Sequence, residues 1–434
     1  MNNSAEAPKV DTERFAAMFE ELSLYGATPK GGLHRLAASR EDGEVRDRFA
    51  KMLLEAGLEV RVDGIGNMFG LCEWTPGADF LLVGSHLDSQ PRGGRFDGAY
   101  GVIAGAAVCM SLLEAVRNGH PAPPLNVAVV NWTNEEGARF RPSLTGSSVY
   151  TGKLALEQAL LLRDDQGITL GEALSAIGYC GVDTPPKPAG CVEIHNEIGR
   201  VLENSGADIG VVTRNWGANK YELVFHGEQA HTGPTPMADR RDALVAASMM
   251  IVEARRIADN YHDEELRTSV GRAVIEPNSA NVVPAKVTLS LEIRSPNSAV
   301  LTELDSYVRT FWKRIQAETR CDIEVLAETR REAMPFWPAG IERAEAVTDQ
   351  LGYTSRRLDT VAGHDVVAVM GLVPGVLIEV PSYQGIGHNE AEYTEPEQLK
   401  RGVEVLNALV WELAHNDPRK TNSQYAVHPD AARA

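Results

Sequence analysis

The sequence predicts an α/β protein whose mixed sheet is interrupted by a smaller inserted α+β domain. Two short apolar runs, FLLVGS and LNVAVVNWT, flank a stretch of small residues over Gly101–Val116, and this strand–helix–strand spacing predicts a parallel βαβ unit. The pattern changes near Asp208 and the α/β alternation returns after Arg330. With 434 residues and 43% hydrophobic content, the chain is long enough for more than one domain. We expect a larger domain over 1–210 and 329–417, an inserted domain over 211–328, and a tail over 418–434.

The N-terminal part contains a helix followed by a hairpin. A helix is expected from Thr12, because Asp11 can cap it and apolar residues recur at helical spacing. Leu58–Phe69 is typical of strand, turn and strand, with the turn over Asp63–Asn67. The glycines of this turn follow the pattern G-x-G-x-x-x-G with no helix after it, which does not favour a dinucleotide-binding loop.

The inserted part begins with GVVTRNWGANKYELVFHGEQAHTG and repeats a β-β-α-like pattern twice. Its expected elements are a helix over ALVAASMMIVEARRIA, a hairpin-like pair TSVGRAVIEP and AKVTLSLEIRS, a helix over Ala299–Thr319 and the strand CDIEVLAET. Beyond it we expect helices near Ile341–Leu351 and Asp365–Met370, the strand GVLIEVP, and a closing helix over Glu395–His415.

Composition indicates a soluble, cytoplasmic protein. The formal net charge of −18 argues against nucleic acid or an anionic membrane as a partner. The N-terminus has no basic segment followed by an apolar one, and the apolar run around Gly101–Leu113 is shorter than a membrane span. The five cysteines form no C-x-x-C pair and are odd in number, so we expect buried, reduced thiols.

Acidic and histidine residues gather where strands are expected to end, which is where open α/β sheets bind ligands. They are His86 and Asp88 in GSHLDS, Asp97 in GGRFDGAYG, Glu135 and Glu136 in NWTNEEG, His195 in VEIHNE, and His388 in GIGHNE. Together they look like the ligand set of a two-metal hydrolase, in which an activated water attacks a carbonyl or phosphoryl centre. The chain has no H-E-x-x-H, G-x-S-x-G or P-loop motif that would favour another chemistry.

Each of these residues also has an ordinary structural explanation. His86 alone would be a core or loop histidine, and Asp97 could cap the helix that follows it. Glu135 and Glu136 could form a solvated pair, although adjacent acids at the end of an apolar strand repel each other, a cost that a metal would relieve. His86 and Asp88 are two residues apart in an extended segment, so Asp88 can orient a neighbouring ligand.

Six segments resemble the M20 metalloamidase group, which includes N-carbamoyl-L-amino acid hydrolases, β-ureidopropionases and allantoate amidohydrolases. They are GSHLDSQPRGGRFDGAYGV, NWTNEEGARF, GEQAHTGPTPMADRRDAL, NSANVVPAKVTLSLEIRSPN, AGHD and GIGHNEAEYT. The resemblance extends from about Arg14 to His415. It implies that the larger domain is a dinuclear-metal catalytic domain and that the inserted domain is a dimerisation (lid) domain.

The same resemblance implies roles for individual residues. Two divalent ions per subunit, Zn²⁺ or Mn²⁺ with Co²⁺ or Ni²⁺ also compatible, would be bound by five ligands: His86, Asp97, Glu136, His195 and His388. Asp97 would bridge the ions, Glu135 would be the general base and Asp88 would support the site. In a homodimer, His231 would reach the neighbouring site and stabilise the oxyanion. Asn281, Arg294 and the backbone of Gly363 would bind a substrate carboxylate.

These roles predict a metal-dependent amidohydrolase that cleaves a linear C–N amide or ureido bond of a small carboxylate-bearing molecule. The expected substrate is an N-carbamoyl amino acid, including N-carbamoyl-β-alanine. Ile198 stands where the family usually has glutamine, and isoleucine cannot form a hydrogen bond, so a less polar acyl group stays open. The alternatives are an N-acyl-amino acid deacylase or dipeptidase with the same centre, and a non-catalytic binding or scaffold protein that kept the fold.

Overall fold

A computed structural model describes residues 7–421, which divide into two compact units. The larger unit contains the described residues up to Thr213, Phe336–Leu358, and those from Ala362 onward; the smaller contains Arg214–Pro335 and Asp359–Val361. Residues 422–434 of the expected tail lie outside the described residues. The catalytic and dimerisation roles expected for the two domains stay predictions.

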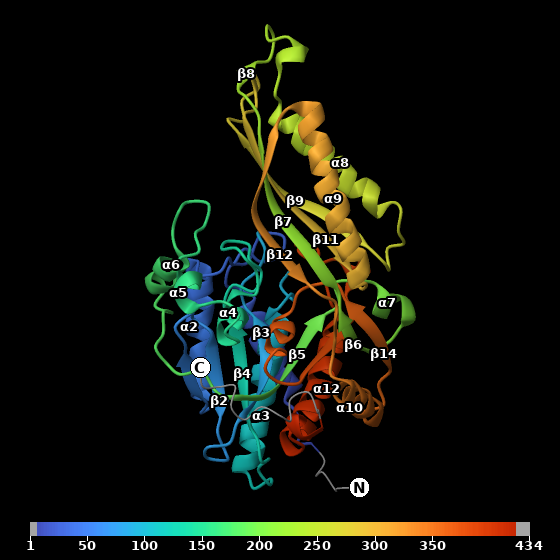
Figure 1. Ribbon diagram of the computed structural model, residues 1–434. Coiled ribbons are helices and arrows are strands. Elements are labelled where there is room, and N and C mark those ends of the chain that lie inside the picture. Colours follow the sequence, from blue (N-terminus) through green and yellow to red (C-terminus); the bar gives the residue numbers. More distant parts are fainter. Residues whose placement is uncertain (1–6, 422–434) are drawn as a thin grey trace. The chain divides into compact units, whose positions relative to one another are not determined.

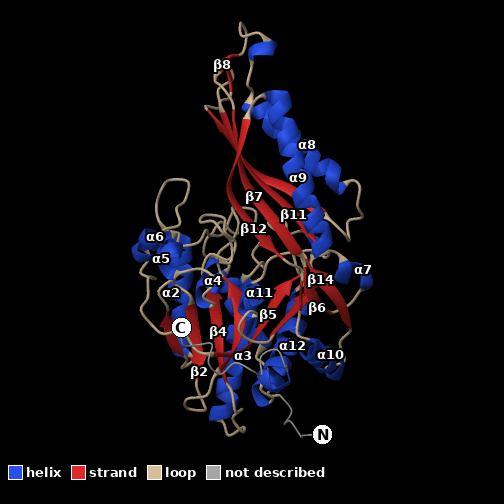
Figure 2. Ribbon diagram, in the orientation of Figure 1, coloured by secondary structure: helices blue, strands red, loops and turns tan. Residues whose placement is uncertain are grey.

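A mixed nine-stranded sheet forms the centre of the larger unit, with its last strand, β13, belonging to the smaller one (Figure 2). The strands are β1 (Glu59–Val62), β2 (Met68–Cys72), β3 (Phe80–His86), β4 (Asn126–Trp132), β5 (Pro188–Asn196), β6 (Ile209–Asn215), β13 (Met334–Pro335), β14 (Ser355–Thr360) and β15 (Gly375–Val380). Their order is β1-β2-β4-β3-β5-β15-β6-β13, and β14 also pairs with β6. The inner strands β4, β3, β5 and β15 are parallel, whereas the pairs at both sides are antiparallel. This confirms the mixed sheet and the predicted parallel βαβ unit.

In the larger unit, the helices that begin at Thr12, Ala99, Pro338, Asp365 and Pro396 agree closely with those expected, whereas the other helices were not predicted. They are α1 (Thr12–Leu22), α2 (Arg40–Glu55), α3 (Ala99–Arg117), α4 (Thr145–Tyr150), α5 (Leu156–Leu160), α6 (Leu170–Ala176), α7 (Val201–Ser205), α10 (Pro338–Gln350), α11 (Asp365–Val369) and α12 (Pro396–His415), with the short 3-10 helices η2 (Tyr383–Gly385) and η3 (Pro418–Thr421). Asp11 caps α1 as predicted, since its side chain accepts a hydrogen bond from the backbone N–H of Arg14.

Two expectations from composition need correction. Helix α3 has 19 residues and is long and apolar enough to cross a membrane, so the apolar run is not too short; however, 83% of its most apolar window is buried inside the protein. A helix that is apolar all round is what a core position requires. Four cysteines are buried, but Cys180 is exposed, because it lies in the loop after α6 rather than in the core.

The smaller unit is an antiparallel sheet covered by two helices. Its strands are β7 (Gly217–His226), β8 (Ala230–His231), β9 (Arg267–Glu276), β10 (Val282–Val283), β11 (Lys286–Ser295) and β12 (Asp322–Arg331), and its helices are η1 (Met237–Asp239), α8 (Ala243–Ala258) and α9 (Ser298–Thr319). The four long strands follow the order β12-β7-β11-β9, and β8 pairs with β10 in a separate ribbon. Helices α8 and α9 lie side by side against this sheet (Figure 1). The expected hairpin-like pair is confirmed as β9 and β11, and the predicted first helix matches α8.

Candidate metal centre

The parallel strands bring the predicted ligands to one edge of the sheet. His86 is the last residue of β3 and His195 lies next to the end of β5. Glu135 and Glu136 follow β4, and His388 lies in the loop after β15. Because these four strands are parallel, their carboxyl ends meet at the same edge. Asp97 comes from the loop that leads into α3.

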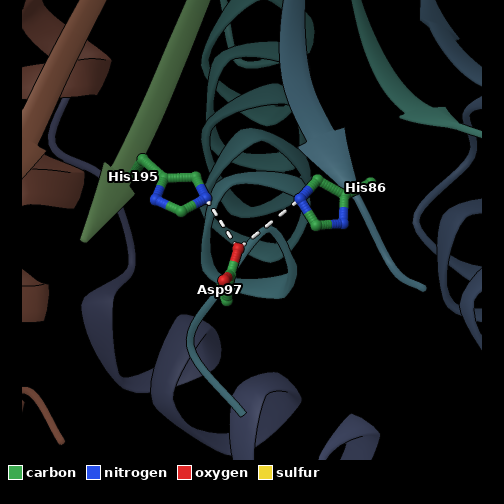
Figure 3. Close-up of side chains that lie close together, drawn as sticks. All are labelled: His86, Asp97 and His195. Carbon is green, nitrogen blue, oxygen red and sulfur yellow. Dashed lines mark ion pairs between the residues drawn. The ribbon is translucent and has the colours of Figure 1, made fainter. Parts of the chain in front are cut away.

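A first group of three buried side chains consists of His86, Asp97 and His195 (Figure 3). Asp97 Oδ1 lies 3.1 Å from His195 Nε2 and 3.6 Å from His86 Nε2. Two imidazoles and one carboxylate therefore point toward a common place in front of the N-terminus of α3. Their potential ligand atoms all lie within 4.8 Å of one another, which suits a single metal ion.

A second group shares Asp97 with the first. Its other members are Glu136 and His388. His388 Nε2 lies 3.2 Å from Asp97 Oδ2 and 3.4 Å from Glu136 Oε2. Asp97 thus offers Oδ1 to one group and Oδ2 to the other, which is the arrangement of a carboxylate that bridges two ions about 3.5–4 Å apart.

Two of the histidine rings are oriented for ligation through Nε2. His86 Nδ1 lies 2.9 Å from the carbonyl of Asp88, and His195 Nδ1 lies 2.9 Å from the carbonyl of Asn196. A carbonyl only accepts hydrogen bonds, so each Nδ1 carries the proton and leaves Nε2 with a lone pair. For His195 the backbone N–H of Gly98 donates to that Nε2 at 3.0 Å. This tautomer is the one that a metal ion requires.

The electrostatics of the pocket also fit divalent cations. Burial, together with the negative charge of Asp97, raises the pKa of Glu136 to about 8. Burial likewise raises the pKa of Glu135 well above its ordinary value. The negative charges of Asp365 and Glu136 raise this pKa as well. Burial opposes a charge on His195, but Asp97 outweighs it and raises this pKa to about 10. The pocket therefore favours a positive charge beside His195, as a proton or as a cation that takes its place.

The position of Asp97 also fits a bound cation. Its Oδ2 is buried and lies 3.2 Å from His388 Nε2, a nitrogen that is itself a potential metal ligand. A cation bound by these two atoms would stabilise the buried carboxylate charge. The N-cap residue of α3 is Gly98, with no side-chain cap, so the explanation of Asp97 as a helix cap is wrong. The nitrogen and oxygen donors of both groups suit Zn²⁺, Mn²⁺, Co²⁺ or Ni²⁺.

Glu135 and Asp88 complete the pocket. Glu135 Oε2 lies 3.4 Å from His86 Nε2. The backbone N–H groups of Glu135 and Glu136 donate to Asp88 Oδ1 and Oδ2 at 3.2 and 3.3 Å. Asp88 also supports His86 through its backbone carbonyl. One buried aspartate therefore fixes the positions of a histidine and of both acids.

Comparison with known proteins explains why these residues occur together. A family model described as peptidase family M20/M25/M40 matches residues 82–412. The chain belongs to this family. It is 36% identical to an N-carbamoyl-L-amino acid amidohydrolase of Geobacillus stearothermophilus (94% of this chain and 100% of the relative covered) and 33% identical to an allantoate amidohydrolase of Bacillus subtilis (91% and 96%). A solved hydantoinase/carbamoylase family amidase from Burkholderia vietnamiensis superposes with a TM-score of 0.90 at 37% identity (96% and 100%).

This M20 family member is thus an amidohydrolase of the carbamoylase type, a hydrolase that acts on C–N bonds. The predicted fold class, a mixed α/β fold with an insertion, is confirmed by the same match. The alternative of a non-catalytic scaffold finds no support, because both groups of potential metal ligands are complete.

The predicted oxyanion donor of the M20 chain, His231, lies in the smaller unit beside Asn281, one of the three predicted substrate-binding residues. His231 in β8 pairs with Val282 in β10, and the backbone N–H of Thr232 donates to the carbonyl of Asn281 at 3.3 Å. Both side chains are exposed. The backbone N–H of Gly233 donates to His231 Nδ1 at 3.1 Å, so a neutral ring carries its proton on Nε2 and can donate it to a ligand.

The other two predicted substrate residues lie elsewhere. Arg294 is on β11, where its guanidinium donates to the carbonyl of Val361 at 2.5 Å and to Glu292 Oε2 at 2.9 Å. The structure thus does contain the salt bridge on a strand that is the ordinary explanation of an arginine there. Gly363 is half-buried and lies two residues before the start of α11. The ring of its neighbour His364 packs edge-on against His195, with centroids 4.8 Å apart.

Sequence reasoning missed several residues that hold the ligands in place. Gln90 donates from its side-chain amide to Glu136 Oε2 at 2.9 Å and from its backbone to Glu136 Oε1 at 3.1 Å. Glu193, two residues before His195, accepts from the Ser85 hydroxyl at 2.7 Å. Glu392 accepts from the backbone N–H of Asp97 at 2.9 Å. A buried strand with an acid two residues from a ligand histidine was the available signal for Glu193.

Proposed function

We propose that this amidohydrolase cleaves an N-carbamoyl amino acid, including N-carbamoyl-β-alanine, at a centre of two divalent metal ions per subunit. The carrying observation is that Asp97 offers one carboxylate oxygen to each of two ligand groups. The names of the relatives support the substrate class. Zinc or manganese suits the donors, with cobalt or nickel also compatible. The proposed location is the cytoplasm.

His86, Asp97, Glu136, His195 and His388 would hold the ions. When bound, such a pair polarises a carbonyl oxygen and makes a water nucleophilic at neutral pH. Glu135 then acts as general base: its carboxylate takes one proton from the attacking water and passes it to the nitrogen that leaves. The water oxygen forms a bond to the ureido carbon as the C–N bond breaks. Loss of the first nitrogen leaves a carbamic acid, and its decarboxylation breaks the second C–N bond. The products are then the free amino acid, ammonia and carbon dioxide.

His231 would donate a hydrogen bond to the developing oxyanion. Its Nε2 carries the proton because Nδ1 accepts from Gly233, as a donor in this role requires. Arg294 and Asn281 would bind the substrate carboxylate, together with the backbone of Gly363. Of the five N–H donors of Arg294, two are used by Val361 and Glu292, which leaves others for a carboxylate.

The length of β11 supports a homodimer. His231 lies beyond the Lys286 end of the strand, since β8 follows His226, which pairs with Lys286. Arg294 lies eight residues further along β11, about 27 Å away at about 3.4 Å per residue. One small substrate cannot contact both residues of the same chain. If both serve one site, His231 must come from the neighbouring subunit, and so must Asn281, which lies beside it.

Helix α8 and strand β9 offer a surface for that neighbour. Val245 and Val252 on α8 have exposed fractions of 51% and 67%. Among the described residues, β9 pairs only with β11 and is an edge of its sheet. An apolar helix face beside an open sheet edge is suited to pairing with an identical copy.

Ile198 favours a second candidate, an N-acyl-amino acid deacylase or a dipeptidase with the same metal centre. Its side chain is half-buried and lies against Gly387, where an added Cβ would be 2.5 Å from Ile198 Cγ2. Gly387 directly precedes His388. An apolar side chain at this place offers no hydrogen bond to a ureido nitrogen and suits an apolar acyl group.

A substrate panel separates the two candidates. N-carbamoyl, N-formyl and N-acetyl derivatives of the same amino acid, together with dipeptides, are assayed with Zn²⁺ or Mn²⁺ supplied. We expect the highest kcat/KM for carbamoyl compounds, with ammonia released. Preferential release of acetate or formate would support the deacylase, and preferential peptide cleavage the dipeptidase. No turnover with any of these compounds would contradict the proposed function.

A further inference from the structure

The loop that carries His388 is hydrogen-bonded to the loop that carries Asp97. Glu392 lies four residues after His388 and its side chain is buried. Its Oε1 accepts hydrogen bonds from the backbone N–H groups of Phe96 at 3.1 Å and Asp97 at 2.9 Å. The two segments are 295 residues apart in the chain. One carboxylate oxygen therefore connects the bridging ligand to the loop of a second ligand.

We propose that Glu392 is a positioning residue that holds Asp97 and His388 at the spacing needed for two ions. It does so through the Asp97 backbone, so it need not touch an ion or the substrate. The inference rests on the proposed metal centre.

The fit around Glu392 is too close for a general packing role. Its carboxyl group lies flat against Gly94, where an added Cβ would be only 2.1 Å from Glu392 Cδ. The same loop packs on Gly32, where an added Cβ would be 2.9 Å from the Cα of Glu390. Glycines at both places let the loop that carries His388 lie directly on the backbone beside Asp97.

The chemistry of the side chain also favours a carboxylate. Two N–H groups converge on one oxygen, so this position needs an acceptor and has no use for a donor. Glu392 Oε2 is buried and makes no hydrogen bond to a described residue. Glutamine would have similar shape, but it would place an NH₂ group with two unpaired donors at this position. Glu392→Gln therefore weakens the hydrogen bonding to the Asp97 backbone while it leaves the side-chain volume nearly unchanged.

The test measures metal binding rather than turnover alone. Wild-type protein and Glu392→Gln are stripped of metal and titrated with Zn²⁺ against a chromophoric chelator, and their Co²⁺ forms are compared by visible absorption. We expect Glu392→Gln to bind metal about 10–100-fold more weakly, as is typical when the partner of a ligand is lost. We also expect a changed Co²⁺ spectrum and a lower kcat with a nearly unchanged KM. Glu390→Gln is the matched control, since it makes the same change in the same loop, and it should behave like wild type.

A second variant approaches the contact from the opposite side. In Gly94→Ala the new methyl group displaces the Glu392 carboxyl, so the same loss of affinity is expected even if Glu392→Gln fails to fold. Wild-type affinity and an unchanged Co²⁺ spectrum in either variant would overturn the inference. If wild-type protein itself binds no metal, the proposed function fails instead, so the two failures can be told apart.

Discussion

The substitution Gly98→Ala tests whether the His86 ring lies in the position that metal binding requires. Gly98 has φ +67°, a left-handed conformation, and a Cβ added there would lie 2.2, 2.3 and 2.4 Å from three atoms of the His86 ring. Carbon atoms in contact are about 3.5–4.0 Å apart, so in Gly98→Ala the ring must move by about 1 Å or more. Metal sites tolerate deviations of only about 0.2 Å in ligand distance. We therefore expect the variant to lose His86 as a ligand and to bind metal more than about 100-fold more weakly.

The effect of backbone strain in Gly98→Ala must be separated from the effect of the steric clash with the His86 ring. Alanine in the left-handed region costs about 1–2 kcal/mol wherever it occurs. Gly178 supplies the matched control, because it has φ +79° and no atom within 4 Å of an added Cβ. Gly178→Ala should lower the free energy of unfolding by a similar amount without changing metal content.

The assay combines metal analysis after dialysis, thermal unfolding and kcat/KM for both variants. Gly98→Ala should retain substantially less metal than Gly178→Ala at comparable stability of the metal-free proteins. If Gly98→Ala keeps the wild-type metal content and activity, the His86 ring does not lie against Gly98 and the geometry of the first group is refuted.

Three further predictions follow from the site and its surroundings. Glu135→Gln should bind metal normally but lose about 10²–10⁴-fold in kcat, and full turnover in steady-state assays would remove Glu135 as the base. Dialysis against a chelator should abolish activity and lower the unfolding temperature, because a bound ligand at 100 times its Kd stabilises the folded protein by about 2.7 kcal/mol. Adding Zn²⁺ or Mn²⁺ should restore both the activity and the unfolding temperature. An unchanged unfolding temperature after dialysis would argue against bound ions. Burial opposes ionisation of Asp208, but hydrogen bonds from Thr354 and Arg401 outweigh it and lower the pKa below its ordinary value. Asp208 therefore contributes to the stability of the fold above its unfolded pKa of about 4, and this contribution is lost as pH falls through the folded pKa. Asp208→Asn should therefore cost about 1–3 kcal/mol at pH 7 in urea unfolding, with a difference from wild type that shrinks below pH about 4; a difference independent of pH would contradict this.

The sequence predicted elements whose signal is local. The strand FLLVGSH and the helix α8 were expected almost within their observed bounds, because apolar periodicity and capping residues lie within a few positions of each other. The ribbon of β8 and β10 was not predicted, since each strand has only two residues and shows no periodicity. That ribbon brings His231 beside Asn281, so a functional neighbourhood was invisible to pattern reasoning.

The predicted ligands were recognised by their positions at strand ends, but their supports were not. Gln90 contacts Glu136 across 46 residues and Glu392 contacts Asp97 across 295. No pattern in one segment indicates which backbone N–H in another will need an acceptor. The resemblance to known metalloamidases identified the ligands and implied that Asp97 bridges two ions, whereas the contacts that support these ligands required coordinates.

The free-energy cost of burying several carboxylates in one pocket explains why metal binding and folding should be linked. Burial raises the pKa of Asp88 to about 7 and that of Glu136 to about 8, so ionising both acids in the folded protein opposes folding at neutral pH. Asp88 accepts two backbone hydrogen bonds, which offset part of its cost, whereas the Asp97 carboxylate is buried between the Nε2 atoms of His195 and His388. Cations that bind the folded chain but not the unfolded one supply the missing favourable charge. The buried acids are therefore tolerated because the site is completed by what it binds.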